Sequence, residues 1–370
     1  MSCLWSSPLV MEGTGPMRDG GNMKKIEQIQ YLRAFAALLV VAYHAPATVA
    51  RFSDALPQLR VGAFGVDIFF VISGFIMGLL GETGKGGRLD FILKRIVRIV
   101  PMYWIVTLLT VCLVLIAPHQ MRSTVVDVPS MVKSLLFIPH FSLGHPGSVW
   151  PIVVPGWTLS YEMFFYAVFA VVIPAARLTR ATFVSMVFAA LAISGFVFHP
   201  ANPVALTFTS TLLLEFVMGV WIAVACRQNV LPSRMLAWIL LVVAVLMLYT
   251  KGAESRGIDK GVPAAAIVLG SLVVLRHFRS RLLGLIGDAS YSIYLMQFFS
   301  FGMTRALWET LGITSSAPLS AASYVVFSIT GSVVTGVATY WFVERPMSAY
   351  LGGLVRQRSA IGPASVAAQS

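Results

Sequence analysis

Long apolar runs alternate with short polar and basic segments along almost the whole chain. A helix that crosses a membrane needs about 20 predominantly apolar residues, and ten runs reach or approach that length. They cover residues 31–50, 65–81, 101–117, 157–174, 181–198, 206–226, 234–250, 261–276, 284–303 and 321–343. The pattern predicts an all-α fold, a polytopic transmembrane bundle of about ten spans.

The composition supports this class of protein. Of the 370 residues, 57% are hydrophobic and 11% are charged, whereas a soluble domain carries about 25% charged residues. Membrane helices in series form one domain, which we expect to cover residues 23–350. We predict a disordered N-terminal extension at residues 1–22 and a disordered C-terminal tail at residues 351–370.

The net charge of +12 could indicate either a nucleic-acid partner or a membrane topology signal. If the N-terminus is cytoplasmic, 18 of the 27 Lys and Arg residues fall in cytoplasmic segments and 8 in outer segments, and Arg33 lies within the first span. This distribution follows the positive-inside rule. It predicts that both termini are cytoplasmic, with membrane lipids as partners, and it argues against nucleic acid.

The first apolar run contains two residues that are expensive to place in a membrane, Arg33 and His44. A charge at the centre of a membrane helix costs at least about 2.5–3.5 kcal/mol on insertion scales. Eleven residues of helix bring these two side chains to within about 20° of the same direction and about 16 Å apart along the axis. Arg33 could extend to the interface and His44 could bond a neighbouring helix, or both could face a cavity.

Further charged residues lie near the ends of other runs. Asp67 opens the second span, where an acid favours the helix dipole, and Glu162 is expected just over one turn below the outer surface. Both are expected near the depth of His44. Arg95 and Arg98 are three residues apart and share a helix face. They could anchor the chain on anionic lipid or bind an anionic phosphate.

The last two spans carry the remaining candidates. Tyr291 and Ser292 belong to a polar stripe on the ninth span, and Glu344 precedes Arg345 at the expected inner surface. A salt bridge or a lipid contact would also explain the Glu344–Arg345 pair. No HExxH or similar motif suggests a metal, so we expect neither a metal nor a bound cofactor.

Six segments together resemble the integral-membrane acyltransferase-3 family, whose members O-acylate carbohydrates. The segments span roughly residues 25–350 in the family's order: LRAFAALLVVAYH, FGVDIFFVISGF, KRIVRIVPMYW, GWTLSYEMFFY, SYSIYL and FVERP. The resemblance implies that His44 is the catalytic histidine and Arg33 its partner. One position departs from the family, which often has histidine shortly after SYSIYL, where this chain has Gln297.

The same resemblance implies roles for the other candidates. Arg95 and Arg98 match the family's arginine motif, and Glu162 matches its acidic residue after the tryptophan. With Glu162 or Asp67 orienting His44, the arrangement would be similar to a catalytic triad. Tyr291, Ser292 and Glu344 are then expected, with the arginines, to bind the donor or the acceptor.

The family implies an enzyme of the bacterial inner membrane, similar to exopolysaccharide acetyltransferases. Its donor is a cytoplasmic acyl-CoA, usually acetyl-CoA, and its acceptor is a hydroxyl of an extracytoplasmic or lipid-linked polysaccharide. Intramembrane charges also occur in transporters, so a transporter or export partner is the alternative, although the ten runs show no inverted repeat. Assembly as a homo-oligomer is a further option.

Overall fold

The computed structural model describes residues 18–19, 22–23, 26–49, 60–80, 87–118, 124–250, 257–312 and 318–361. These residues are helical apart from loops and one two-residue ladder, in which β1 (Arg18–Asp19) pairs antiparallel with β2 (Asn22–Met23). The predicted all-α class is confirmed. The helices, in chain order, are α1 (Glu27–Val49), η1 (Arg60–Phe64), α2 (Gly65–Leu79), α3 (Gly87–Ile116), α4 (Val128–Leu135), α5 (Gly156–Val171), α6 (Arg177–Phe198), α7 (Pro203–Phe208), α8 (Leu213–Arg227), α9 (Arg234–Thr250), α10 (Ile258–Val274), α11 (Arg281–Asp288), α12 (Ser290–Thr310), α13 (Pro318–Thr339), η2 (Tyr340–Glu344) and α14 (Arg345–Ile361).

Every predicted apolar run coincides with helical structure, although two of the runs are divided. The run at 206–226 breaks between α7 and α8, and the run at 284–303 breaks between α11 and α12. Among the described residues, five helical stretches are long and apolar enough to cross a membrane: Gly62–Leu79, Gly87–Ile116, Arg177–Phe198, Pro203–Arg227 and Leu319–Gln357. The chain is therefore a helical membrane protein, and the total of ten spans stays a prediction.

The predicted terminal segments have different outcomes. Most of residues 1–22 lies outside the described residues, as does 362–370. The predicted disorder of 351–361 is wrong, because α14 continues through this stretch. α14 is less apolar than the other long helices. It packs along α3 on one side, which leaves the other side for its polar residues.

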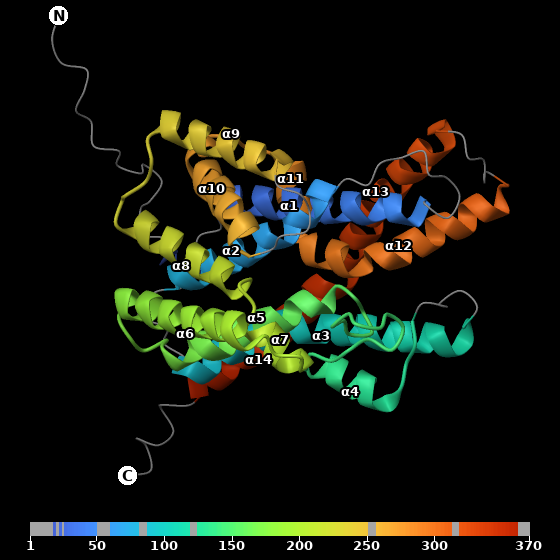
Figure 1. Ribbon diagram of the computed structural model, residues 1–370, viewed down its shortest axis with the longest axis horizontal. Helices are drawn as coiled ribbons and strands as arrows, with labels where there is room; N and C mark the ends of the chain where they lie inside the picture. The colour runs from blue at the N-terminus through green and yellow to red at the C-terminus, as the bar shows by residue number, and fades with distance from the viewer. Residues whose placement is uncertain are drawn as a thin grey trace, which may run out of the picture.

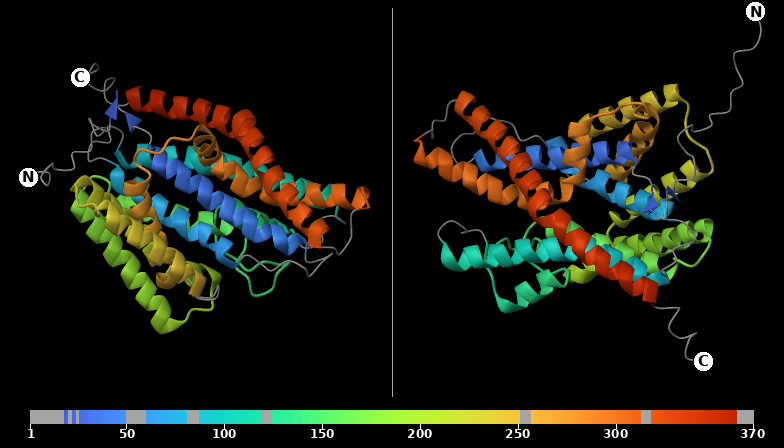
Figure 2. Two further views of the ribbon diagram at one scale, coloured as in Figure 1. Left: turned by 90° about the horizontal axis from the view of Figure 1, so that it is seen from above. Right: turned by 180° about the vertical axis from the view of Figure 1, so that it is seen from behind.

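The helices form two groups that lie one above the other in Figure 1. One group contains α1, α2 and α8–α13, and the other contains α3–α7 and α14. Contacts of α6 with α8 and of α3 with α12 join the groups. The continuous run from α13 through η2 into α14 crosses from the first group to the second, as the rear view in Figure 2 shows.

The helix α2 lies inside the bundle, whereas α6 lies at its edge. In the apolar windows of the two helices, 83% of residues are buried in α2 and 22% in α6. Two glycines let α2 and α8 approach closely, since a Cβ on Gly74 would overlap the backbone of Phe216 and one on Gly219 would overlap Val71. Small residues at helix contacts serve this purpose in membrane proteins. The close packing fixes the position of α2 within the bundle.

Candidate active site

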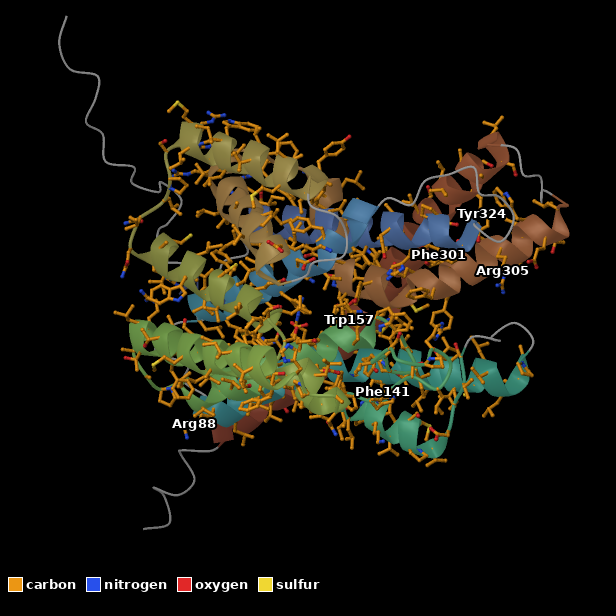
Figure 3. The ribbon with its side chains drawn as sticks, in the orientation of Figure 1. Arg88, Phe141, Trp157, Phe301, Arg305 and Tyr324 are labelled. Atoms are coloured by element: carbon orange, nitrogen blue, oxygen red, sulfur yellow. The ribbon has the colours of Figure 1, made fainter. Side chains whose placement is uncertain are left out.

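Two adjoining cavities lie between the two helix groups. The apolar cavity, of about 250 Å³, is lined by residues of α1, α2, α3, α5 and α12. The cationic cavity, of about 530 Å³, is lined mainly by α1, α3, η2 and α14. The two share four wall residues, namely Gln30, Arg33, Arg95 and Arg98. Figure 3 shows side chains extending into the space between the groups.

The cationic cavity carries an excess of positive charge. Lys94 is neutralised by an ion pair with Asp90 at 2.7 Å. Four further cations line the wall, against two acids: Arg33, Arg95, Arg98 and Arg345, with Asp288 and Glu344. Guanidinium groups bind phosphate and carboxylate oxygens through paired hydrogen bonds. The cavity is therefore suited to an anionic ligand.

Arg33 lies at the boundary of the two cavities. Its side chain is 8% exposed, and Nη1 donates a hydrogen bond to Gln30 Oε1 at 3.2 Å, one turn earlier on α1. It is thus buried among the helices and lines both cavities. This placement favours the cavity interpretation over extension to the membrane surface.

Arg95 and Arg98 both line the two cavities, as their shared helix face predicts, but they are held differently. The Arg95 guanidinium carbon lies 5.8 Å from the ring centroid of Phe91 and 5.9 Å from that of Tyr166, within cation–π range. Within the described part of the chain, nothing accepts a hydrogen bond from Arg95 Nε. Arg98 is exposed to the cavity. Arg95 is therefore held in place by aromatic rings, and Arg98 is not.

Glu162 lies deeper in the bundle than expected. α5 runs antiparallel to α3, since Gly156 packs on the Tyr103 ring and the Tyr166 ring lies 6.2 Å from that of Phe91. Glu162, between these two contacts, therefore reaches the level of the arginines on α3. The predicted depth near the outer surface is wrong because α5 begins opposite the middle of α3, not at its end.

The Glu162 carboxylate accepts hydrogen bonds from two hydroxyl groups. Ser73 Oγ on α2 donates at 2.8 Å to Oε1, and the Tyr166 hydroxyl donates to the same oxygen. Sequence analysis singled out neither Ser73 nor Tyr166 as a functional residue. The spacing of four residues from Glu162, which places both on one helix face, could have indicated Tyr166.

His44 and Asp67 line neither cavity. The His44 ring lies 5.2 Å from that of Phe298 on α12. Asp67 is fully buried at the start of α2, where the neighbouring Gly65 packs against Ala36 and Val40 of α1. Asp67 is thus about two helical turns, roughly 12 Å, from the level of His44. The expected common depth is wrong for Asp67, because α2 starts beside the middle of α1.

The candidates on α12 contact two different neighbours. The Tyr291 hydroxyl donates to the backbone oxygen of Ile99 at 2.8 Å, which joins α12 to α3 near Pro101. Ser292 Oγ donates to the buried Glu344 carboxylate at 2.5 Å. Tyr291 lines the apolar cavity and Glu344 the cationic cavity. The two polar residues of the stripe therefore contact different helices, Tyr291 contacting α3 and Ser292 contacting η2.

Glu344 ends a short π-helix, η2, which the sequence pattern did not predict. Such π-helical turns are rare and occur often at functional sites. The sequence suggested a salt bridge for the Glu344–Arg345 pair, but the two side chains contact different partners. Glu344 bonds Ser292, while the Arg345 guanidinium lies 4.2 Å from the ring centroid of Trp341.

A small hydrogen-bonded group lines the apolar cavity away from the arginines. Thr158 Oγ1 lies 3.1 Å from the Tyr294 hydroxyl, and both hydroxyls donate to the Pro155 backbone oxygen. Gln297, at the position that departs from the family pattern, is fully buried, and its Nε2 donates to the Tyr294 backbone oxygen at 2.9 Å. Gln297 therefore stabilises the turn of α12 beside the Thr158–Tyr294 pair.

Comparison with known proteins identifies the family of the chain. A family model described as an acyltransferase domain, Acyl_transf_3, matches residues 26–337. The chain belongs to the acyltransferase-3 family. It is a membrane O-acyltransferase, as the names of its relatives also indicate. No solved structure matches it.

Three relatives illustrate the family. ExoZ of Rhizobium meliloti (strain 1021), an exopolysaccharide production protein, is 34% identical over 296 residues, covering 78% of this chain and 90% of ExoZ. YrhL of Bacillus subtilis (strain 168), to which peptidoglycan O-acetyltransferase activity is ascribed, is 25% identical over 372 residues, 85% of this chain and 54% of YrhL. MdmB of Streptomyces mycarofaciens, named an acyltransferase, is 26% identical over 375 residues, 89% of this chain and 93% of MdmB.

Proposed function

We propose that the enzyme transfers an acyl group, most simply acetyl, from cytoplasmic acyl-CoA to a hydroxyl of an extracytoplasmic or lipid-linked bacterial polysaccharide. The observation that carries the proposal is the pair of joined cavities. Acyl-CoA has phosphates at one end and a thioester at the end of a long thin arm. The cationic cavity suits the phosphates, and the apolar cavity suits the arm.

The names of the relatives support the acceptor and the acyl group. ExoZ is named for exopolysaccharide production and YrhL for O-acetylation of peptidoglycan. We extend both to this chain as a polysaccharide acceptor and an acetyl group. The two names refer to different polysaccharides, so the particular sugar must be found by experiment.

The chemistry is an acyl transfer that balances without a cofactor. A sugar hydroxyl attacks the thioester carbon, the carbon–sulfur bond breaks as the ester carbon–oxygen bond forms, and the hydroxyl proton leaves with a base. CoA departs as a thiolate and takes up a proton. His44 is the proposed base, or it accepts the acyl group and passes it on. Its ring lies 5.2 Å from that of Phe298, one turn of α12 beyond Tyr294, and Tyr294 lines the apolar cavity.

The proposed topology has ten spans in the bacterial inner membrane, with both termini in the cytoplasm. Besides the positive-inside distribution, the positions of two arginines support it. Arg88 is expected inside and Arg305 outside, and Figure 3 shows them at opposite ends of the molecule. Single cysteines replacing Leu143 and Arg281, both exposed, test it with a membrane-impermeant maleimide on intact cells. Only Leu143→Cys should react, and the reverse pattern would reject the topology.

The function is tested with the purified full chain and acetyl-CoA carrying a labelled acetyl group. Unacylated polysaccharide from a deletion strain serves as the acceptor. We expect label in the polysaccharide and release of free CoA in equal amounts. Intact acetyl-CoA after incubation, with label accumulated inside proteoliposomes, would instead identify a transporter. Loss of the thioester without any labelled polysaccharide would reject the proposed acceptor.

A further inference from the structure

A third cavity, here called the loop cavity, lies on the other side of α5 from the apolar cavity. It measures about 80 Å³ and is lined by α4, α5, α7 and the segment that joins α4 to α5. Trp104 on α3 holds α4 in place, because its Nε1 donates to the Leu135 backbone oxygen at 2.8 Å. The loop cavity shares no wall residue with the two cavities of the candidate active site.

His140 is the most informative residue of the loop cavity. It is 6% exposed, and its Nδ1 lies 2.9 Å from the Ile138 backbone oxygen. A carbonyl oxygen only accepts hydrogen bonds, so Nδ1 of the neutral ring carries the hydrogen and Nε2 is an acceptor. Within the described ranges, no residue bonds Nε2. Although the residue is largely buried, Nε2 is not among the fully buried polar atoms. It is therefore accessible on the wall of the loop cavity, where a ligand hydroxyl can donate to it.

A second buried polar group and several rings complete the wall. Ser160 is 7% exposed and lines the loop cavity from α5. Trp157 and Tyr161, on the same helix, also line it, and Phe137 lines it from the loop. Figure 3 labels Trp157 on α5 and Phe141 on the loop beyond α4. Aromatic faces beside neutral hydrogen-bonding groups suit a sugar, which has apolar C–H faces and hydroxyl edges.

We propose that the loop cavity binds the acceptor, taking one hydroxyl-bearing edge of a pyranose unit. The inference rests on the proposed function, and it adds the place where the saccharide is recognised. His140 Nε2 accepts a hydrogen bond from one sugar hydroxyl, and Ser160 bonds a second. A cavity of 80 Å³ has room for about five to eight water molecules at roughly 10–15 Å³ each, which is less than a whole oligosaccharide needs. It therefore holds one edge of one sugar, and the rest of the polysaccharide stays outside.

The position of the loop cavity suits an acceptor subsite. The Phe70 ring lies 6.3 Å from that of Trp157 and 5.8 Å from that of Tyr161, and Phe70 itself lines the apolar cavity. A layer of aromatic rings thus separates the two cavities. A saccharide held by one edge in the loop cavity is therefore close to a donor arm in the apolar cavity.

The experiment uses two substitutions of His140 that separate its ring nitrogens. His140→Asn keeps a donor near the Nδ1 position, which preserves the bond to Ile138, but it removes Nε2. His140→Gln restores a polar group near Nε2. Ser160→Ala removes the second hydroxyl contact. His145→Ala is the matched control, because His145 lies in the same loop, packs against Trp150 and does not line the cavity.

Two quantities are measured on the purified full chain. One is equilibrium binding of radiolabelled oligosaccharides, released from unacylated polysaccharide, without acyl-CoA. The other is the acceptor KM with labelled acetyl-CoA. A lost neutral hydrogen bond should weaken saccharide binding roughly two- to tenfold in His140→Asn and in Ser160→Ala. The double variant should show approximately the product of the two effects. His140→Gln and His145→Ala should stay near wild type, and the Kd for CoA should not change.

The possible outcomes separate this inference from the proposed function. If the double variant binds saccharide as tightly as His145→Ala, the loop cavity is not the acceptor subsite, even when transfer is normal. If wild type binds saccharide and the variants lose binding, but no acetyl group is transferred, the subsite stands and the proposed function fails. Melting temperatures are measured for every variant, and recovery in His140→Gln shows that loss in His140→Asn does not come from misfolding.

Discussion

The apolar cavity and the loop cavity lie on opposite sides of α5 and are built in different ways. The apolar cavity and the adjoining cationic cavity are walled mainly by helices, and the three arginines that they share lie on α1 and α3. The loop cavity takes about half of its wall from the segment between α4 and α5. Loops tolerate change better than the helices that support them. Under the proposed function, the helices would keep one donor while the loop changes with the acceptor.

The two regions also differ in charge. The cationic cavity gathers four arginines against two acids, and a bound anion would offset the excess. The loop cavity has one lysine, Lys133, which is exposed, and is otherwise neutral. Phosphates and sugar hydroxyls would thus be recognised by separate surfaces. The predictions below test whether the two surfaces bind their ligands independently. They begin with His44, the proposed base for the transfer between the two ligands.

The largest effect is expected at His44. His44→Ala should lower acyl transfer by about 10²–10⁴-fold, because general-base help is lost, while CoA binding stays near wild type. His44→Gln keeps a polar side chain but cannot act as a base, so it should be equally inactive. Glycan acylation in a knockout strain, protein level and CoA binding are measured together. Acylation near wild type in the Gln variant would reject the catalytic role.

The next effect concerns the cationic cavity. Arg95→Ala and Arg98→Ala should each raise the Kd for CoA by about 10- to 100-fold, because a charge-assisted contact contributes roughly 1.5–3 kcal/mol. Saccharide binding should not change. Isothermal titration with CoA measures the effect, and Arg281→Ala, which removes an exposed positive charge elsewhere, is the control. If all three variants bind CoA equally, the arginines on α3 only contact lipid.

A smaller effect distinguishes the two arginines from each other. Arg95→Lys should weaken CoA binding about fivefold, since a lysine cannot reproduce the guanidinium between the Phe91 and Tyr166 rings. Arg98→Lys should stay within about twofold of wild type, because an exposed charge is retained. Equal losses in the two lysine variants would show that the rings do not hold Arg95. The measurement is the same CoA titration.

The smallest effect concerns the anchor of the loop cavity. Trp104→Phe removes the hydrogen bond to Leu135 and should cost about 0.5–1.5 kcal/mol of local stability. Saccharide binding should weaken by a few-fold and CoA binding should not. Hydrogen exchange of α4 and the two binding assays measure this. Weaker binding of both ligands would mean that the two regions are coupled.

The sequence pattern determined most of what depends on one helix at a time. Each of the ten apolar runs became helical, because apolar length is a local property. Arg95 and Arg98 face the same cavities, as a spacing of three residues requires. The six motifs in order also placed the chain in its family. The first two features depend only on the properties of a single helix, and the third depends only on the order of the residues.

Tertiary structure alone decided how far each helix is shifted along its neighbours. The start of α5 against the Tyr103 ring sets Glu162 beside the arginines, and the start of α2 against Ala36 sets Asp67 away from His44. The π-helical turn at Glu344 and the loop that carries His140 are likewise products of packing. Periodicity fixes the direction of a side chain around its own axis. It contains no information about the offset between two axes, which depends on close contacts between residues far apart in the sequence.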